Sequence, residues 1–463
     1  MIFQSVTFVT FFVVVFAVYW WLSKWHTAQN LWLLAASYFF YGYADWRMLP
    51  LLIGATLLFY GLGYKIAVAQ TERIAKIYLW TGVGTGVGIL FAFKYIGIFL
   101  PCVHIIVPIG ISFFTFKLLS YIIETYYHKT ELLGAGNMTW NGVLEFATYI
   151  AFFPTILAGP IDRPAFILQL QTPRTFVYNE AVEGCRALLW GAFLKMVVAD
   201  TCALYVDMAW MDLNVARGST LVVAAILYAV QIYADFAGYS SMAIGIALLL
   251  GLRVIQNFRT PFLSLNMADF WRRWHISLTQ WLTDYVFMPL NIRLRRLGKW
   301  GVALATMVNM TLVGLWHGAN FTYLLFGIYH GLLLVWLVLT GRNRLPKQLT
   351  WYQRQGRYLA TFCLCVFGWI IFRAPDMASV GVYMQRLFSA SLFSCPMTIG
   401  LLDRCMIVVS CLLMWCLDVR GRKHSIPLAI SNTAVRWTVY FALTIGIWFV
   451  ATRRATDFIY FAF

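Results

Sequence analysis

The chain has 463 residues, of which 61% are hydrophobic and only 11% are charged, whereas soluble domains are about 45–50% apolar and about 25% charged. This excess excludes a soluble globular protein and predicts an all-α polytopic membrane protein. The net charge is +17, but the cations gather in short loops between apolar runs, where they set membrane topology. No aromatic-basic groove or soluble module accompanies the charge, which argues against nucleic-acid binding.

Apolar runs long enough to enter a bilayer recur along the chain. The first, from Ser5 to Ser23, lacks the basic flank and the cleavage site of a signal peptide, so we interpret it as a retained helix. We expect about 11–13 transmembrane helices in a single integral membrane domain covering 1–463. In chain order the candidate spans are 5–23, 30–44, 48–69, 78–100, 104–126, 143–158, 188–209, 220–250, 301–317, 321–340, 358–373, 401–417 and 434–451.

Three segments depart from this pattern. The segment 106–113 contains Pro108 and Gly110, and the segment 153–164 contains three prolines. Helix breakers inside apolar sequence are typical of re-entrant segments, which need protein or a water-filled cavity around them. The third segment, 256–299, is too polar to span, and its aromatic residues recur at helical spacing, which predicts an interfacial helix. His275 lies beside that aromatic stripe, from where its ring could reach inward.

His317 lies within an apolar run, where a titratable ring is costly and indicates function. A buried histidine that only bonds a neighbouring helix gains about 0.6 kcal/mol, so we favour a general base, provided that a partner fixes its tautomer. His330 follows thirteen residues later and would face away from His317 on a continuous helix. No His-Glu-x-x-His motif or His/Cys cluster is present, so we expect no metal site and a structural role for His330.

Asp235 is an acid within another apolar run. It could orient a histidine, pair with an arginine, line a polar tunnel or serve as a buried structural carboxylate. These alternatives stay open from the sequence alone.

Several motifs together resemble the membrane-bound O-acyltransferase superfamily, and within it the bacterial AlgI/PatA-like branch of polysaccharide O-acetyltransferases. The matching motifs are Pro108-Ile-Gly-Ile-Ser112-Phe, Phe153-Pro-Thr-Ile-Leu-Ala-Gly-Pro160, Asp235-Phe-Ala-Gly-Tyr-Ser240, Phe270-Trp-Arg-Arg-Trp-His275-Ile-Ser277-Leu and Gly314-Leu-Trp-His317-Gly-Ala-Asn320. The resemblance implies a ring of helices around a central tunnel, with the motif-bearing core at about 105–340. It also implies that His317 is the catalytic histidine and that His275 is the second histidine of this branch.

The resemblance leads to a hypothesis for function: an inner-membrane enzyme that supplies acetyl groups for O-acetylation of a cell-envelope polysaccharide, such as peptidoglycan or alginate. Acetyl-CoA would be the donor, with no permanently bound cofactor, and the acceptor hydroxyl would belong to a periplasmic SGNH-hydrolase-like partner. We expect further residues to contact substrate or line the tunnel, namely Asp235, Trp271, Arg273, Trp316, Asn320 and Tyr323.

Two other functions remain as alternatives. Gly159-Pro-Ile-Asp162-Arg163 and Asn309-Met-Thr-Leu are similar to segments of DltB, a relative that transfers D-alanine to cell-wall polymer. In a transporter, buried His317 and Asp235 would form a proton relay. A transporter of this kind is commonly built from repeats with corresponding broken helices, and we find no such internal repeat in the sequence.

Overall fold

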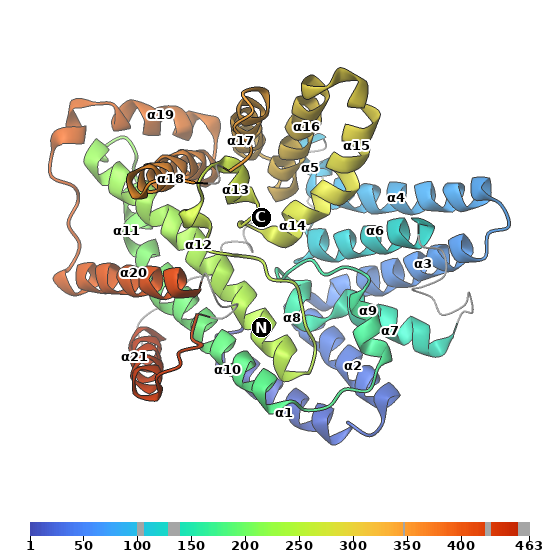
Figure 1. Cartoon of the computed structure of the whole chain (residues 1–463). Coiled ribbons are helices and arrows are strands. Elements are labelled where there is room, and N and C mark those ends of the chain that lie inside the picture. The colour runs from blue at the N-terminus through green and yellow to red at the C-terminus, as the bar shows by residue number, and fades with distance from the viewer. Residues whose placement is uncertain (100–105, 128–138, 346–347, 422–426, 452–463) are drawn as a thin grey trace. The chain divides into compact units, whose positions relative to one another are not determined.

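The computed structural model describes residues 1–99, 106–127, 139–345, 348–421 and 427–451. Every regular element in these ranges is a helix and none is a strand (Figure 1), which confirms the predicted all-α class. The chain divides into two compact units, of which unit 1 comprises Met1–Leu188 with Tyr239–Ile255 and unit 2 comprises Leu189–Gly238 with Gln256–Phe463. The single domain and the helical ring around a tunnel stay predictions.

Unit 1 contains most of the amino-terminal helices, of which α3, α4 and α6 pack against one another (Figure 1). Two long helices, α10 and α12, have residues in both units. The elements that begin in unit 1 are α1 (Val6–Trp21), α2 (His26–Asp45), η1 (Trp46–Met48), α3 (Leu49–Ala67), α4 (Glu72–Lys94), α5 (Ile96–Phe99), α6 (Ile111–Tyr127), α7 (Trp140–Ala151), α8 (Phe153–Ile156), α9 (Phe166–Gln171) and α10 (Tyr178–Ala192).

The two predicted chain breaks are present in unit 1. Residues 106–110 precede α6 without forming a helix, and α7 ends at Ala151, before the short α8. Gly110 has a φ of 75°, and a side chain added there would collide with the carbonyl oxygen of Ile156. Glycine is therefore required where the two broken segments meet. The predicted spans 104–126 and 143–158 are consequently shorter than expected, and residues 104 and 105 lie outside the described ranges.

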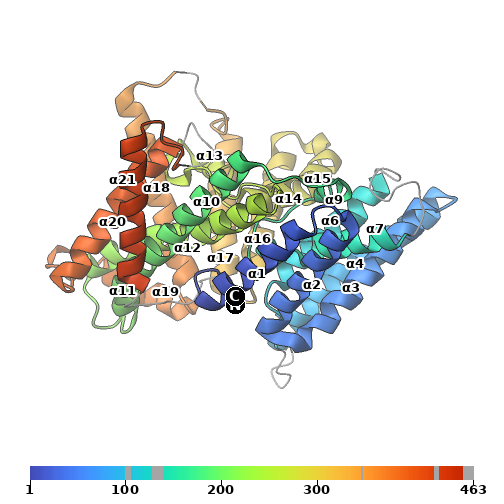
Figure 2. The ribbon, with the colours of Figure 1, turned by 90° about the horizontal axis from the view of Figure 1, so that it is seen from below.

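Unit 2 contains the remaining helices, including α20 and α21, which are labelled in Figure 2. Within this unit, both of these helices pack against the π-helix η2. Its elements are η2 (Phe193–Ala199), α11 (Asp200–Trp210), α12 (Gly218–Leu249), η3 (Pro261–Leu263), α13 (Met267–Trp271), α14 (Ile276–Leu282), η4 (Thr283–Phe287), α15 (Met288–Arg293), η5 (Arg295–Leu297), α16 (Lys299–His317), α17 (Phe321–Leu339), α18 (Trp351–Arg373), α19 (Met377–Leu387), η6 (Ala390–Phe393), α20 (Leu401–Gly421) and α21 (Thr433–Ala451).

Seven helical stretches in the described part of the chain are long and apolar enough to cross a membrane. This number is below the predicted 11–13, and α16 and α20, which cover the predicted spans 301–317 and 401–417, are not among the seven. The elements α2, η1 and α3 run on as one helical stretch of 42 residues, and α1, α6 and α7 have only 16, 17 and 12 residues. The chain is a multi-pass membrane protein.

The aromatic stripe predicted within the segment 256–299 does not lie on one continuous helix. The chain there is divided into short helices, and α13 ends at Trp271 before α14 begins at Ile276. His275, just before α14, has a φ of 45° and a ψ of 53°. A left-handed residue cannot continue an α-helix, so the aromatic stripe bends at this point. The aromatic residues Phe270, Trp271, Trp274 and Trp281 are buried.

Candidate active site

His275 is held at the bend between α13 and α14 by one asparagine. Its Nδ1 lies 3.0 Å from Oδ1 of Asn257, and the Oγ of Ser277 donates to the same oxygen at 2.9 Å. The backbone oxygen of Asn257 accepts from the N–H of Ile276 at 2.9 Å. Asn257 therefore stabilises both the left-handed backbone and the direction of the imidazole ring.

This arrangement selects one tautomer of His275. The backbone N–H of Ser277 donates to Oδ1 of Asn257 at 3.3 Å, and a backbone N–H can only donate. The Asn257 atom is therefore the carbonyl oxygen, and Nδ1 of His275 must donate to it. In the neutral ring the lone pair is then on Nε2, which is the atom able to accept a proton.

Burial also determines the charge of His275. The residue is 1% exposed and lies outside the seven candidate membrane-spanning helices. Desolvation lowers the pKa of His275 below its ordinary value, because a charged imidazolium loses its hydration inside the protein. The ring is therefore neutral at neutral pH and suited to accepting a proton.

His317 is the last residue of α16 and is 5% exposed. Its position depends on close packing of α16 against α17, because a side chain at Gly314 would collide with the carbonyl oxygen of Tyr323. The ring of His317 makes an edge-to-face contact with the ring of Phe372, with a centroid distance of 4.8 Å. Its centroid lies 6.1 Å from that of Tyr323 and 6.2 Å from that of Phe326. His317 is thus a polar ring in an aromatic enclosure.

Trp316 connects the two histidines. Its ring centroid lies 5.4 Å from that of His275 and 4.9 Å from that of His317. Phe236, on α12, covers His275 in an edge-to-face contact at 4.7 Å. The structure therefore brings the two histidines predicted to be catalytic into contact with one indole ring.

Tyr323 and Trp271 belong to the same aromatic enclosure, but only Tyr323 contacts His317 directly. Tyr323 lies near His317 directly, whereas Trp271 contacts Phe326 at 6.3 Å and His330 at 5.2 Å. Trp271 therefore lies beside His330, and Phe326 contacts both Trp271 and His317. Among the ring contacts of the described residues, none joins Trp271 to His275 or His317.

Arg273 and Asn320 make local structural contacts. Nε of Arg273 donates to Oδ1 of Asp269 at 2.9 Å, one turn earlier in the chain. The Asn320 side chain accepts from the N–H of Thr322 at the start of α17 and donates to the carbonyl oxygen of Pro375 at 2.7 Å. The Arg273 side chain thus pairs with Asp269, and the Asn320 side chain caps α17 and anchors the loop at Pro375. Contact of either side chain with a substrate stays a prediction.

Asp235 forms a buried ion pair with a lysine. Its Oδ1 lies 2.9 Å from Nζ of Lys195, and the same Nζ lies 2.8 Å from Oδ1 of Asp200. Lys195 lies in the π-helix η2, a distortion that is frequent at functional sites. Of the alternatives for Asp235, pairing with a cation holds, although the cation is a lysine and not an arginine. Asp235 adjoins Phe236 and thereby links this cluster to the wall around His275.

Several residues of this region were missed by sequence reasoning. Asn257 and Phe372 carry no pattern that marks them, because their roles depend on the left-handed bend and on helix packing. Lys195 did carry a signal, since a lysine within the apolar run Leu188–Val198 is as costly as a histidine. Within the described residues there is no group of three His, Cys, Asp or Glu side chains that could hold a metal ion.

These features define a multi-pass helical membrane protein with two buried histidines around one tryptophan. A model of the membrane-bound O-acyltransferase family matches residues 39–373. The chain is 36% identical over 411 residues to the probable alginate O-acetylase AlgI of Pseudomonas aeruginosa, which covers 84% of this chain and 75% of that protein. It is 30% identical over 393 residues to the peptidoglycan O-acetyltransferase of Helicobacter pylori, covering 76% of this chain and 72% of that protein.

A more partial similarity joins the chain to a third kind of protein, the teichoic acid D-alanyltransferase of Bacillus subtilis. The two are 31% identical over 247 residues, which covers 50% of this chain and 60% of that protein. Because the family match extends over most of the chain, the protein belongs to the membrane-bound O-acyltransferase family. It is an O-acyltransferase, and the predicted family resemblance is confirmed.

Proposed function

We propose that this O-acyltransferase transfers acetyl groups for O-acetylation of a cell-envelope polysaccharide from the bacterial inner membrane. The support is the similarity over most of the chain to an alginate O-acetylase and to a peptidoglycan O-acetyltransferase. The observation that carries the chemistry is the pair His275 and His317, each in ring contact with Trp316.

In the proposed reaction His317 is the general base. It removes the proton from an acceptor hydroxyl as the oxygen attacks the acyl carbon of a thioester, and the carbon–sulfur bond then breaks to release a thiol and leave an ester. The resulting imidazolium can stabilise the developing oxyanion in a site from which water is excluded. His275 assists by fixing the position of Trp316, whose ring contacts both histidines.

The donor and the acceptor are proposals of their own. Acetyl-CoA on the cytoplasmic side is the thioester that we propose, and a tunnel would bring its acetyl group to His317. The acceptor hydroxyl would belong to a periplasmic SGNH-hydrolase-like partner that passes the acetyl group to the polysaccharide. We propose that Trp316 and Tyr323, which adjoin His317, line the passage at this point.

D-alanyl transfer is the second candidate. It is favoured by the similarity to the teichoic acid D-alanyltransferase, which covers only half of this chain. Both reactions would use the same histidines, because each places an acyl group on a hydroxyl.

The proposal is tested by His317→Gln, with ester-linked acetate and ester-linked D-alanine on the envelope measured separately. We expect acetate to fall by about 100-fold or more, since general base catalysis contributes about 10²–10⁴. The matched control is His330→Gln, which changes another buried histidine on the neighbouring helix. Unchanged acetate in correctly inserted His317→Gln protein would overturn the mechanism, and loss of D-alanine instead of acetate would establish the second candidate.

A further inference from the structure

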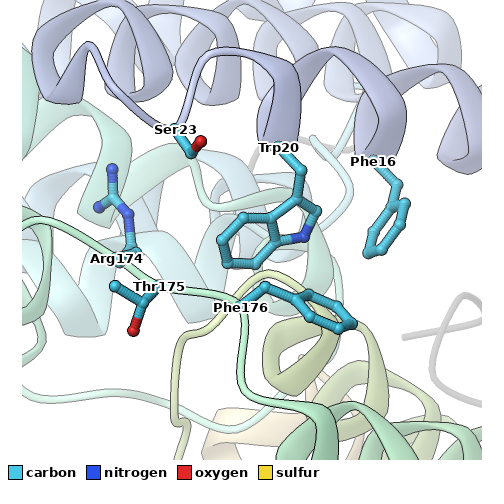
Figure 3. Close-up of a pocket in the computed structure, with 6 residues that line it drawn as sticks. All are labelled: Phe16, Trp20, Ser23, Arg174, Thr175 and Phe176. Carbon is cyan, nitrogen blue, oxygen red and sulfur yellow. The ribbon is translucent and has the colours of Figure 1, made fainter.

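A groove in unit 1 combines an apolar wall with a buried cation (Figure 3). It has a volume of about 460 Å³ and lies between α1 and the segment that leads into α10. The groove is remote in the chain from both catalytic histidines, and the acyl-transfer chemistry assigns it no role. Its lining residues are Phe16, Trp20, Ser23, Arg174, Thr175 and Phe176.

Arg174 is buried although its neighbours in the chain are exposed. It is 6% exposed, whereas residues 171–173 and 175–179 are all exposed. Its Nε and Nη2 donate to Oε1 of Gln29 at 3.1 and 2.9 Å, and Nη2 also donates to Oδ1 of Asn30 at 2.6 Å. These bonds hold the guanidinium in one orientation at the groove.

The partners of Arg174 do not neutralise its charge. Gln29 and Asn30 are neutral, and within the described residues no carboxylate lies within 4.0 Å of the Arg174 guanidinium. Glu145 attracts the guanidinium only from farther away. The third nitrogen, Nη1, is buried without a hydrogen-bond partner in the described residues. The guanidinium also packs over the ring of Tyr19, with its Cζ 5.6 Å from the ring centroid. A buried cation without a paired anion is costly, and an anion in the groove would reduce that cost.

Aromatic rings line the rest of the groove, so the groove has one apolar end and one polar end. The ring of Phe176 lies 5.3 Å from that of Trp20 and 6.4 Å from that of Phe16, in edge-to-face contacts. Nε1 of Trp20 donates to the carbonyl oxygen of Leu249 at 3.0 Å, so this wall is anchored. Ser23 and Thr175 are the polar lining residues nearest Arg174 (Figure 3), although the Thr175 hydroxyl points away from the guanidinium. One end thus suits an anionic group and the other suits a hydrocarbon chain.

The residues after Trp20 indicate where this groove lies relative to the bilayer. α1 is an apolar helix that ends at Trp21, and Trp21, Lys24 and Trp25 are exposed. Tryptophan and lysine at the end of an apolar helix are typical of the membrane–water interface. Lipid phosphates occupy this depth, and basic pockets on membrane helices bind anionic lipid head groups.

We propose that this groove is a binding site for an anionic phospholipid such as phosphatidylglycerol. The lipid phosphate would be attracted by the buried positive charge of Arg174 and would accept a hydrogen bond from the hydroxyl of Ser23. One acyl chain would pack along Phe176, Trp20 and Phe16. The apolar wall distinguishes this occupant from inorganic phosphate, which would gain nothing from the aromatic rings.

The test uses the full chain, purified and delipidated, with native mass spectrometry to measure binding of phosphatidylglycerol, phosphatidylcholine and inorganic phosphate. Arg174→Gln is expected to weaken phosphatidylglycerol binding by about tenfold and to leave phosphatidylcholine binding unchanged. The matched control is Arg73→Gln, because Arg73 lines another groove of unit 1 but is exposed. It is expected to bind phosphatidylglycerol as the wild type does.

A second variant keeps the proposal testable if Arg174→Gln fails to fold, since Arg174 also bonds Gln29 and Asn30. Phe176 is 51% exposed, so Phe176→Asp should fold, and its carboxylate should repel phosphatidylglycerol by a similar factor. Phe393→Asp, in an exposed part of unit 2, is its control. Wild-type phosphatidylglycerol binding by Phe176→Asp would overturn the proposal, as would displacement of the lipid by inorganic phosphate at equal concentration.

Discussion

His275 and His330 are both fully buried histidines in unit 2, but their surroundings differ in kind. His275 donates from Nδ1 to Asn257, and this bond fixes which nitrogen carries the lone pair. His330 packs against Phe326 at 4.5 Å and Trp271 at 5.2 Å, and neither of its ring nitrogens has a hydrogen-bond partner in the described residues. A side chain at Gly368 would collide with its ring.

The difference shows that two equally buried histidines can differ in whether a hydrogen bond fixes the tautomer of the ring. A general base needs a defined tautomer and a neighbour with which to act. His275 has both, through Asn257 and through Trp316, which also contacts His317. His330 fills space between α17 and α18 as an aromatic side chain would. The contrast yields predictions that separate catalysis from packing.

The largest expected effect is on catalysis at His275. His275→Gln should lower acyl transfer by about 100-fold or more, whereas His330→Leu should change it by less than about twofold. His330→Leu should also keep or raise stability, because an apolar group replaces two unsatisfied nitrogens. Initial rates and unfolding midpoints of both proteins check this, and equal losses of rate would abolish the distinction between the two histidines.

The next effect concerns the ion cluster beside the site. Lys195→Met should destabilise the protein by about 3–5 kcal/mol, because it leaves buried carboxylates without their cation. Asp235→Asn should cost less, since Asp200 still pairs with Lys195. Denaturant unfolding of the two variants provides the comparison. A larger loss for Asp235→Asn would show that Asp235 does more than balance charge.

A smaller effect is expected at Asn257, which orients His275. Asn257→Ala should reduce the rate by about tenfold, because loss of such a hydrogen bond costs about 1–3 kcal/mol and about 1.36 kcal/mol corresponds to tenfold. Asn214→Ala, at an exposed asparagine of the same unit, is the control. If Asn257→Ala keeps the wild-type rate, the tautomer of His275 is not set by this bond.

The smallest effect is the pH dependence of stability. The pKa of His275 is lowered in the folded protein by burial, and in the unfolded chain it is near 6.5. Below about pH 6.5 the unfolded chain therefore binds a proton that the folded chain does not, and stability falls as the pH falls. This slope should decrease in His275→Gln, as unfolding midpoints at pH 6.5 and 4.5 would reveal. An unchanged slope would mean that His275 is not buried as a neutral ring.

Much of the helical framework could be predicted because apolar runs determine it. Predicted spans such as 321–340 and 434–451 correspond closely to α17 and α21. The helix over 270–282 was wrong because spacing alone does not reveal that His275 adopts a left-handed backbone. A non-glycine residue in that region is uncommon, and here the cost is offset by bonds from Asn257, eighteen residues away.

The candidate site was predicted unevenly for the same reason. His317 stood out because its ring is costly in apolar sequence, and its burial agrees with that signal. Its enclosure by Phe372 depends on the packing of α18, which no local pattern encodes. Similarly, the partner of Asp235 lies 40 residues earlier at Lys195, so only the folded chain identifies it.

The central claim is that His275 and His317 act as one catalytic unit. A double-mutant cycle tests it most directly, with acyl transfer measured for His275→Gln, His317→Gln and the combined variant at equal membrane insertion. Residues that act as a unit have strongly non-additive effects, so the combined variant should be about as slow as His317→Gln alone. Full additivity of the two losses, or wild-type transfer by His317→Gln, would contradict the account.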